Sequence, residues 1–173
     1  MTQPTAVRNV RPWGAEAADL ILRDGRIDAL QPPAPATEWA ATDLDGQGLL
    51  ALPSIVNTHA HVDKSWWGLP WQSYGGEGGT DGRIRHERAR RDELGIPGVD
   101  ITTRVLQQMV SHGTTLIRSH VDVDLGLGLR GIEVVREAVA SFDGGVHAEV
   151  VAFPQDGVLR RPGVDKLLDQ AAA

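Results

Sequence analysis

Two histidines separated by a single residue are the side chains in this sequence best suited to metal chemistry. His59 and His61 follow the largely apolar segment 49–56 and precede Asp63. On a β-strand, residues two apart point to the same side, so both imidazoles would face the same space. Two neutral imidazoles form half of a divalent metal site, and Asp63 shares their spacing. The pattern predicts a metal bound by His59 and His61 and supported by Asp63. The alternative is that both histidines only close the strand by hydrogen bonding.

Polar residues follow two further strand-like segments. His120 and Asp122 come after segment 114–117 with the same spacing of two, and Gln155 comes after segment 146–153. We expect His120 and Asp122 to support the site, either by holding a metal ligand in one tautomer or by contacting the substrate. The amide of Gln155 both donates and accepts, which suits the edge of a cyclic amide or amidine. The simpler alternatives are a hydrogen-bonded strand end and an ordinary turn residue.

Other charged and aromatic residues lie close to these in the sequence. Lys64 follows Asp63 directly, and we expect its ammonium to be solvated rather than a charge partner beside the metal. The charged run 83–91 predicts a helix with a solvated face. Trp66, Trp67 and Trp71 either wall a pocket for a flat ring or cover a core, and the second role is the more common one for such residues.

The elements that must position these residues alternate between strand and helix patterns. Apolar β-type runs predict parallel strands, and the segments between them have helical spacing and end at turn signals such as Gly113. In such sheets the chemistry gathers at the carboxyl ends of the strands, where all these polar residues lie. The predicted strands are 49–56, 114–117 and 146–153, and the predicted helices are 99–113, 129–141 and 164–173. Before them, residues 5–30 read as short strands around an Asp24-Gly25 turn, and prolines then interrupt regular structure.

Composition excludes several classes of protein. The chain of 173 residues has no cysteine, so it has neither disulfides nor thiolate metal ligands, which leaves His and oxygen ligands for a metal. A net charge of -6 argues against a nucleic-acid partner. The sequence has no apolar run of membrane-spanning length and no secretory signal, so we expect a cytoplasmic protein without a membrane partner. Segment 57–64 contains no glycine, which argues against a flavodoxin-like phosphate loop after the first strand.

Three blocks of residues, taken in order, resemble the amidohydrolase superfamily. They are Leu52-Pro53 through His59-Ala60-His61-Val62-Asp63-Lys64, then Gly113-Thr114 with Arg118-Ser119-His120-Val121-Asp122-Val123, and finally Val151-Ala152-Phe153-Pro154-Gln155-Asp156-Gly157. Within the superfamily, the blocks are most similar to the cytosine deaminase group and its triazine-ring relatives. The resemblance covers nearly the whole chain.

The resemblance implies a fold and an activity. The fold is α/β, a (β/α)8 TIM barrel preceded by a small β-sandwich, with residues 1–54 forming part of the sandwich and 55–173 forming the first three β/α units. His59 and His61 would bind catalytic zinc or iron, and Gln155 would contact a small heterocyclic substrate. The metal-activated water would hydrolyse a C–N bond other than a peptide bond, with deamination of a ring such as cytosine as the leading reaction. Hydrolysis of an N-alkyl amine or a cyclic amide, and a truncated module without catalysis, are the alternatives.

The resemblance also implies residues that this sequence does not contain. The family's acid–base glutamate, two further histidines and a metal-binding aspartate come from later strands, beyond Ala173. A complete barrel takes about 250 residues, so we expect a partner that supplies the missing C-terminal half, or a homo-oligomer. An open parallel sheet exposes an unpaired edge, so the isolated chain is expected to be inactive and either poorly stable or self-associating.

Overall fold

The chain passes from one folded unit to a second at Pro53. The computed structural model describes residues 5–73 and 75–173, and it divides into the units Met1–Pro53 and Ser54–Ala173. The expectation of one strand over residues 49–56 is wrong, because β5 (Leu50–Ala51) pairs within the first unit and β6 (Ile55–Ala60) within the second. The break has a simple cause: proline lacks the N–H that a continuous strand would donate.

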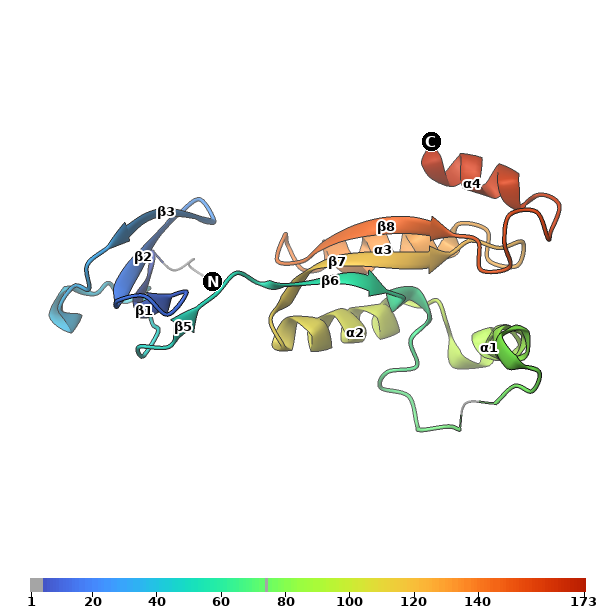
Figure 1. Ribbon diagram of the computed structural model, residues 1–173, viewed down its shortest axis with the longest axis horizontal. Coiled ribbons are helices and arrows are strands. Elements are labelled where there is room, and N and C mark those ends of the chain that lie inside the picture. Colours follow the sequence, from blue (N-terminus) through green and yellow to red (C-terminus); the bar gives the residue numbers. More distant parts are fainter. Residues whose placement is uncertain (1–4, 74) are drawn as a thin grey trace. The chain divides into compact units, whose positions relative to one another are not determined.

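The first unit is a sheet of short strands, with the order β3-β2-β1-β4 and with β5 also paired to β1 (Figure 1). The hairpin between β2 and β3 turns at Asp24 and Gly25, which have φ values of 50° and 72°, as the Asp-Gly turn signal predicts. Asp19 is fully buried in this unit and accepts hydrogen bonds from the backbone N–H groups of Asn9 and Ala34 and from Arg8. The elements are β1 (Ala6–Pro12), β2 (Ala18–Arg23), β3 (Arg26–Gln31), η1 (Ala36–Glu38) and β4 (Leu44–Asp45).

The second unit contains a parallel sheet with the order β6-β7-β8 (Figure 1). The predicted alternation of strand and helix is confirmed, and with it the mixed α/β class; closure into a barrel stays a prediction. None of the helices in the described part of the chain has both the length and the apolarity needed to cross a membrane. Beside β6, the elements are η2 (Val62–Lys64), α1 (Gly79–Leu94), α2 (Val99–Ser111), β7 (Thr114–Asp122), α3 (Arg130–Ala140), β8 (His147–Phe153) and α4 (Val164–Ala172).

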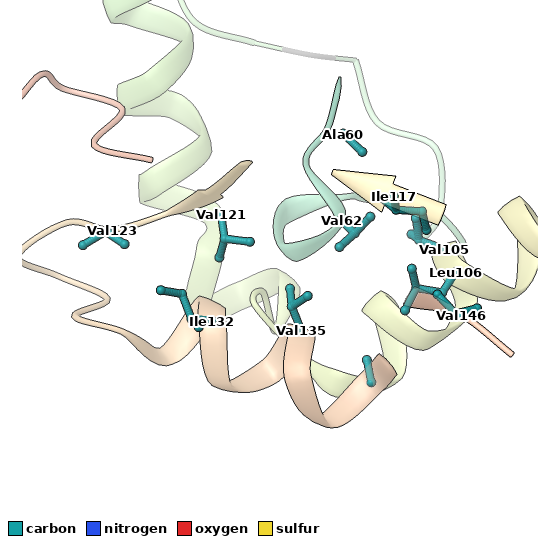
Figure 2. Packing of buried hydrophobic residues seen from close by; sticks show 11 residues of the cluster. Ala60, Val62, Val105, Leu106, Ile117, Val121, Val123, Ile132, Val135 and Val146 are labelled. Atoms are coloured by element: carbon teal, nitrogen blue, oxygen red, sulfur yellow. The ribbon is translucent and has the colours of Figure 1, made fainter. Parts of the chain in front are cut away.

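The main core lies where α2 and α3 pack against β7 and η2. Figure 2 shows Ile132 and Val135 of α3 across the core from Val121 of β7 and Val62 of η2, with the side chains facing one another. Leu106 of α2 and Val135 are fully buried. The apolar spacing of the two helices therefore serves one purpose, which is to cover a single face of the sheet.

Shortening the most deeply buried leucine should destabilise the second unit. Leu106 has 0% relative exposure, so Leu106→Ala removes packed methyl groups and leaves a cavity. We expect a loss of about 2–5 kcal/mol in the free energy of unfolding. Urea unfolding followed by helical circular dichroism measures this loss, because the α-helices of the described chain all lie in this unit. Leu159→Ala is the matched control, since Leu159 is 97% exposed and should change stability by less than about 0.5 kcal/mol. Equal effects of the two variants would contradict this core.

Candidate functional site

Three histidine rings meet at the carboxyl ends of β6 and β7. The rings of His59 and His120 stack with their centroids 4.2 Å apart and their planes 20° apart. The ring of His61 lies 5.4 Å from that of His59 and 5.8 Å from that of His120. The structure thus brings together the two predicted metal ligands and the predicted supporting histidine.

The alternation of side chains along β7 explains why His120 joins this cluster. Ile117 and Val121 are buried in the core that α2 and α3 cover, whereas Leu116 and Arg118 are exposed on the opposite face. His120 shares the spacing of the exposed residues, so it lies on the face away from these helices. The parallel pairing of Ala60 with Ser119 brings the ends of the two strands to the same level. One face of the sheet is therefore packed and the other carries the imidazoles.

The environment of the rings fits a metal-binding role. Nδ1 of His61 and Nδ1 of His120 are buried and have no hydrogen-bond partner among the described residues. Burial, and then the positive charge of Lys64, lower the pKa of His61, which favours the neutral imidazole that binds metals. Across residues 5–73 and 75–173, no group of three or more metal-binding side chains is arranged to hold an ion. The cluster therefore fits part of a metal site rather than a complete one.

Phe153 is a neighbour of this cluster that sequence reasoning missed. Its ring meets those of His61 and His120 edge-on, with centroid distances of 5.4 and 5.9 Å and interplanar angles of 62° and 87°. Phe153 is the last residue of β8, directly before the Pro154-Gln155 step that was singled out in the sequence. Its position at a strand end, next to a candidate site residue, was the available signal.

Asp63 has a different position from the one that strand spacing suggests. The chain leaves the extended conformation after His61 and forms the 3-10 turn η2, so the alternation of sides no longer applies. The carboxylate of Asp63 is buried and accepts a hydrogen bond of 3.0 Å from the backbone N–H of Asp122. Burial raises the pKa of Asp63 to about 6. Asp63 joins the turn after β6 to the end of β7.

Lys64 is not solvated, and that expectation was wrong. Its side chain is only 14% exposed, and its ammonium donates to Asp122 over 2.9 Å and also to Oε1 of Gln155. The same nitrogen lies 3.9 Å from Glu87 and 5.9 Å from the centroid of the Phe153 ring. The predicted site residues Asp122 and Gln155 thus meet through this lysine. The buried carboxylate of Asp122 supplies the physical reason, because it needs a cation beside it.

The charged run 83–91 is also not a simply solvated face. Its last residue, Arg91, is buried and donates to Asp122 over 2.8 Å and to Asp124 over 2.7 Å. Burial raises the pKa of Asp124, but the bonds and charge of Arg91 more than offset this and leave that pKa below its usual range. Glu87 and Arg88 share the helix face of Arg91, at spacings of four and three. That spacing, together with the acidic residues after β7, was the signal that sequence reasoning did not use.

The tryptophans do not all cover a core. Trp66 packs against a small second cluster formed by Leu94, Ile96 and Ile101. Trp67 and Trp71 are 54% and 87% exposed, so for these two the core-covering expectation was wrong. All three line an open apolar cavity of about 560 Å³ together with neighbouring residues of the same loop.

Removing the cation of Arg91 should strongly destabilise the second unit. Arg91→Met leaves Asp122 and Asp124 buried without this guanidinium, at an expected cost of about 3–5 kcal/mol in the free energy of unfolding. Arg118→Met is the matched control, because Arg118 and its partner Glu149 are half exposed and their pair should contribute less than about 1 kcal/mol. Urea unfolding of both variants tests the contrast, and a cost below 1 kcal/mol for Arg91→Met would show that the network is not structural.

Comparisons with known proteins identify relatives of this chain. No family model matches the chain. A solved structure of N-isopropylammelide isopropylaminohydrolase from Burkholderia multivorans is 37% identical, has a TM-score of 0.83, and covers 99% of this chain and 43% of its own. A structure of 5-methylcytosine deaminase from Klebsiella pneumoniae, solved with 5-fluorocytosine, is 26% identical and has a TM-score of 0.72. The match covers 96% of this chain and 40% of the deaminase. Among curated proteins, the uncharacterized protein YahJ of Escherichia coli K12 is 31% identical over 140 residues, which are 80% of this chain and 30% of its own length.

The chain matches only part of the length of each of these relatives. The chain spans about a third of the length of the curated relative and about two fifths of the solved structures. The two solved structures are those of hydrolytic enzymes, and one of these enzymes is a deaminase. The expected resemblance is confirmed: the chain corresponds, over almost its entire length, to the N-terminal portion of enzymes of the amidohydrolase family.

Proposed function

We propose that this chain supplies part of the active site of a metal-dependent hydrolase that removes an amine from a carbon atom of a nitrogen heterocycle. The observation that carries the proposal is the meeting of His59, His61 and His120 on the open face of the sheet, beside the pair of Lys64 and Gln155. In the reaction, the oxygen of water bonds to the sp² ring carbon and the C–N bond breaks. One proton of the water goes to the leaving nitrogen, which departs as ammonia or a neutral alkylamine, and the other goes to a ring nitrogen. The ring carbon keeps the oxygen as a carbonyl.

In this proposal His59 and His61 bind the metal, zinc or iron, and His120 lies against them. When bound, a divalent metal of this kind lowers the pKa of water and so supplies a nucleophile at neutral pH. The lowered pKa of His61, which favours its neutral form, and the buried Nδ1 atoms of His61 and His120 that have no partner among the described residues support this assignment. We assign the acid–base residue and the remaining metal ligands to the part of the relatives' length that this chain does not span.

The substrate side of the proposal rests on Lys64 and Gln155. Lys64 is held by Asp122, and its position fixes the amide oxygen of Gln155. The amide nitrogen of Gln155 then remains to donate to a ring nitrogen or carbonyl. Phe153 offers an apolar edge beside the histidines for a flat ring. The ammonium of Lys64 and the amide nitrogen of Gln155 are donors beside the ring of Phe153, and together they suit a pyrimidine or triazine that carries a carbonyl.

The leaving amine separates two forms of the proposal. Loss of ammonia from a cytosine-like ring is the leading form, and the likeness to the Klebsiella deaminase supports it. Loss of an alkylamine is the second form, supported by the higher identity to the Burkholderia isopropylaminohydrolase. Both use the same histidines and the same water chemistry. They differ in whether the pocket around the leaving nitrogen accommodates an alkyl group.

The proposal includes a fold. Residues 55–173 would be the first three β/α units of a (β/α)8 barrel, and residues 1–54 part of a β-sandwich. The exposed apolar residues Val56 and Leu116, which pair across β6 and β7, support this, because the inner face of a barrel would bury them. The isolated chain is then expected to bind metal weakly, to associate through its open sheet and to be inactive.

Loss of either proposed ligand should strongly weaken zinc binding by the chain. Equilibrium dialysis against Zn²⁺, followed by elemental analysis, should show that His59→Ala or His61→Ala weakens binding roughly 100-fold or more, since even partners outside the ligand set contribute about 10–100-fold. His112→Ala, which alters an exposed histidine at the end of α2, should change binding little. Equal zinc binding by all these variants would refute the assigned ligands.

A chimera tests the activity itself. Replacing the matched 43% of the Burkholderia isopropylaminohydrolase with this chain joins the proposed half-site to the rest of an active enzyme. We expect the chimera to release an amine from N-isopropylammelide or from cytosine, and which of the two it uses identifies the leaving group. The same chimera with His59→Ala should lose the activity. A folded, metal-loaded chimera that acts on neither substrate would favour a module without catalysis.

A further inference from the structure

Two cavities lined by arginines lie beside α1, separate from the histidine cluster. Their volumes are about 260 and 280 Å³, and both are lined by Arg88 and Arg161. No histidine lines either cavity. Each has room for roughly nine molecules of liquid water at about 30 Å³ apiece, and so for a small ion with part of its hydration shell.

The first cavity has a surplus of positive charge. Its charged lining consists of Arg85, Arg88, Arg160, Arg161, Asp81 and Asp156, which leaves two positive charges. The whole chain has a net charge of -6, so the charge of the cavity is opposite in sign to that of the chain. A local surplus of this kind attracts anions over short distances even where the distant field does not.

The ion pairs in this cavity do not use all the guanidinium donors. Asp156 is shared, since it lies 2.5 Å from Arg88 and 2.7 Å from Arg161. The pair of Arg160 and Asp81 is long, at 3.5 Å, and exposed. Arg85 makes no ion pair with any described residue within 4.0 Å. The carboxylates present therefore leave donors for a further acceptor.

A buried donor atom of Arg88 without a hydrogen-bond partner among the described residues is a second observation that points to a bound acceptor. Its Nη2 is buried and has no hydrogen-bond partner in the described part of the chain, although Nη1 is bound to Asp156. A buried charged donor without an acceptor is costly, and native proteins almost always satisfy such groups. Because Arg88 lines both cavities, an acceptor in either one lies next to this side chain.

We propose that the cavity formed by Arg85, Arg88, Arg160 and Arg161 binds a small oxyanion with two negative charges, of which inorganic phosphate is the probe. Two charges on the ligand balance the two in excess, and its oxygens accept from the fork-shaped guanidinium groups. The site is distinct from the proposed metal site, and it requires neither a bound metal nor catalysis.

The test measures phosphate binding to the full 173-residue chain after treatment with EDTA, so that no metal contributes. Equilibrium dialysis with radiolabelled phosphate should show saturable binding with a Kd of about 1 mM or tighter. Arg85→Ala combined with Arg160→Ala removes two exposed donors and should weaken binding roughly tenfold or more. Arg88→Lys keeps the charge but loses the fork, and it should weaken binding as well.

A double variant of equal charge is the control. Arg118→Ala combined with Arg136→Ala removes two exposed arginines that line neither cavity, and it should change the affinity less than twofold. Three results would overturn the site: no saturable phosphate binding, equal weakening by both double variants, or displacement of phosphate by an equal concentration of chloride. Because Arg85 and Arg160 are exposed, circular dichroism should show that the variant with both replaced by alanine remains folded.

Discussion

The guanidinium of Arg91, held between Asp122 and Asp124, is the interaction on which the arrangement of the site depends. Asp122 is the last residue of β7, Asp124 follows two positions later, and both carboxylates are nearly inaccessible to water. Taking such charges out of water is costly unless each meets an opposite charge at short distance. Arg91 supplies that charge from α1, and Asp122 in turn holds Lys64, which holds Gln155. The helix α1, which follows β6, therefore sets the position of Gln155, which follows β8.

The two faces of the sheet in the second unit have different roles, since one packs into the core and the other carries the histidine rings. Residues such as Ile117 and Val121 face α2 and α3 and form the core, while their neighbours along β7 lie on the open face. The packed face gives the strands a fixed register, because a shift by one residue would move every side chain to the wrong side. That register is what brings His120 against His59. Packing and chemistry are thus two consequences of one alternation.

The two solved structures of related enzymes give the histidine cluster its context. They are enzymes more than twice as long as this chain, and their named substrates are small nitrogen heterocycles or derivatives of them. In the proposed function, His59 and His61 would form one part of the metal site of such an enzyme. Arg91 and Asp124 of the ion-pair network also line the second arginine cavity, and Arg88, which lines both cavities, lies 3.3 Å from Asp124. The network thus joins two regions with different chemistry.

The sequence by itself determined the alternation of strand and helix, the class of the fold and the placement of His59, His61 and His120 at the ends of strands. These depend on local periodicity, which is written into consecutive residues. Only the tertiary structure decided that Asp63 turns away into η2, that Lys64 is buried, and that Arg91 belongs to the site rather than to a solvated helix face. The reason is physical: the state of a charged side chain depends on which opposite charges the fold places beside it. Those partners, such as Asp122 for Arg91, are about thirty positions away along the chain.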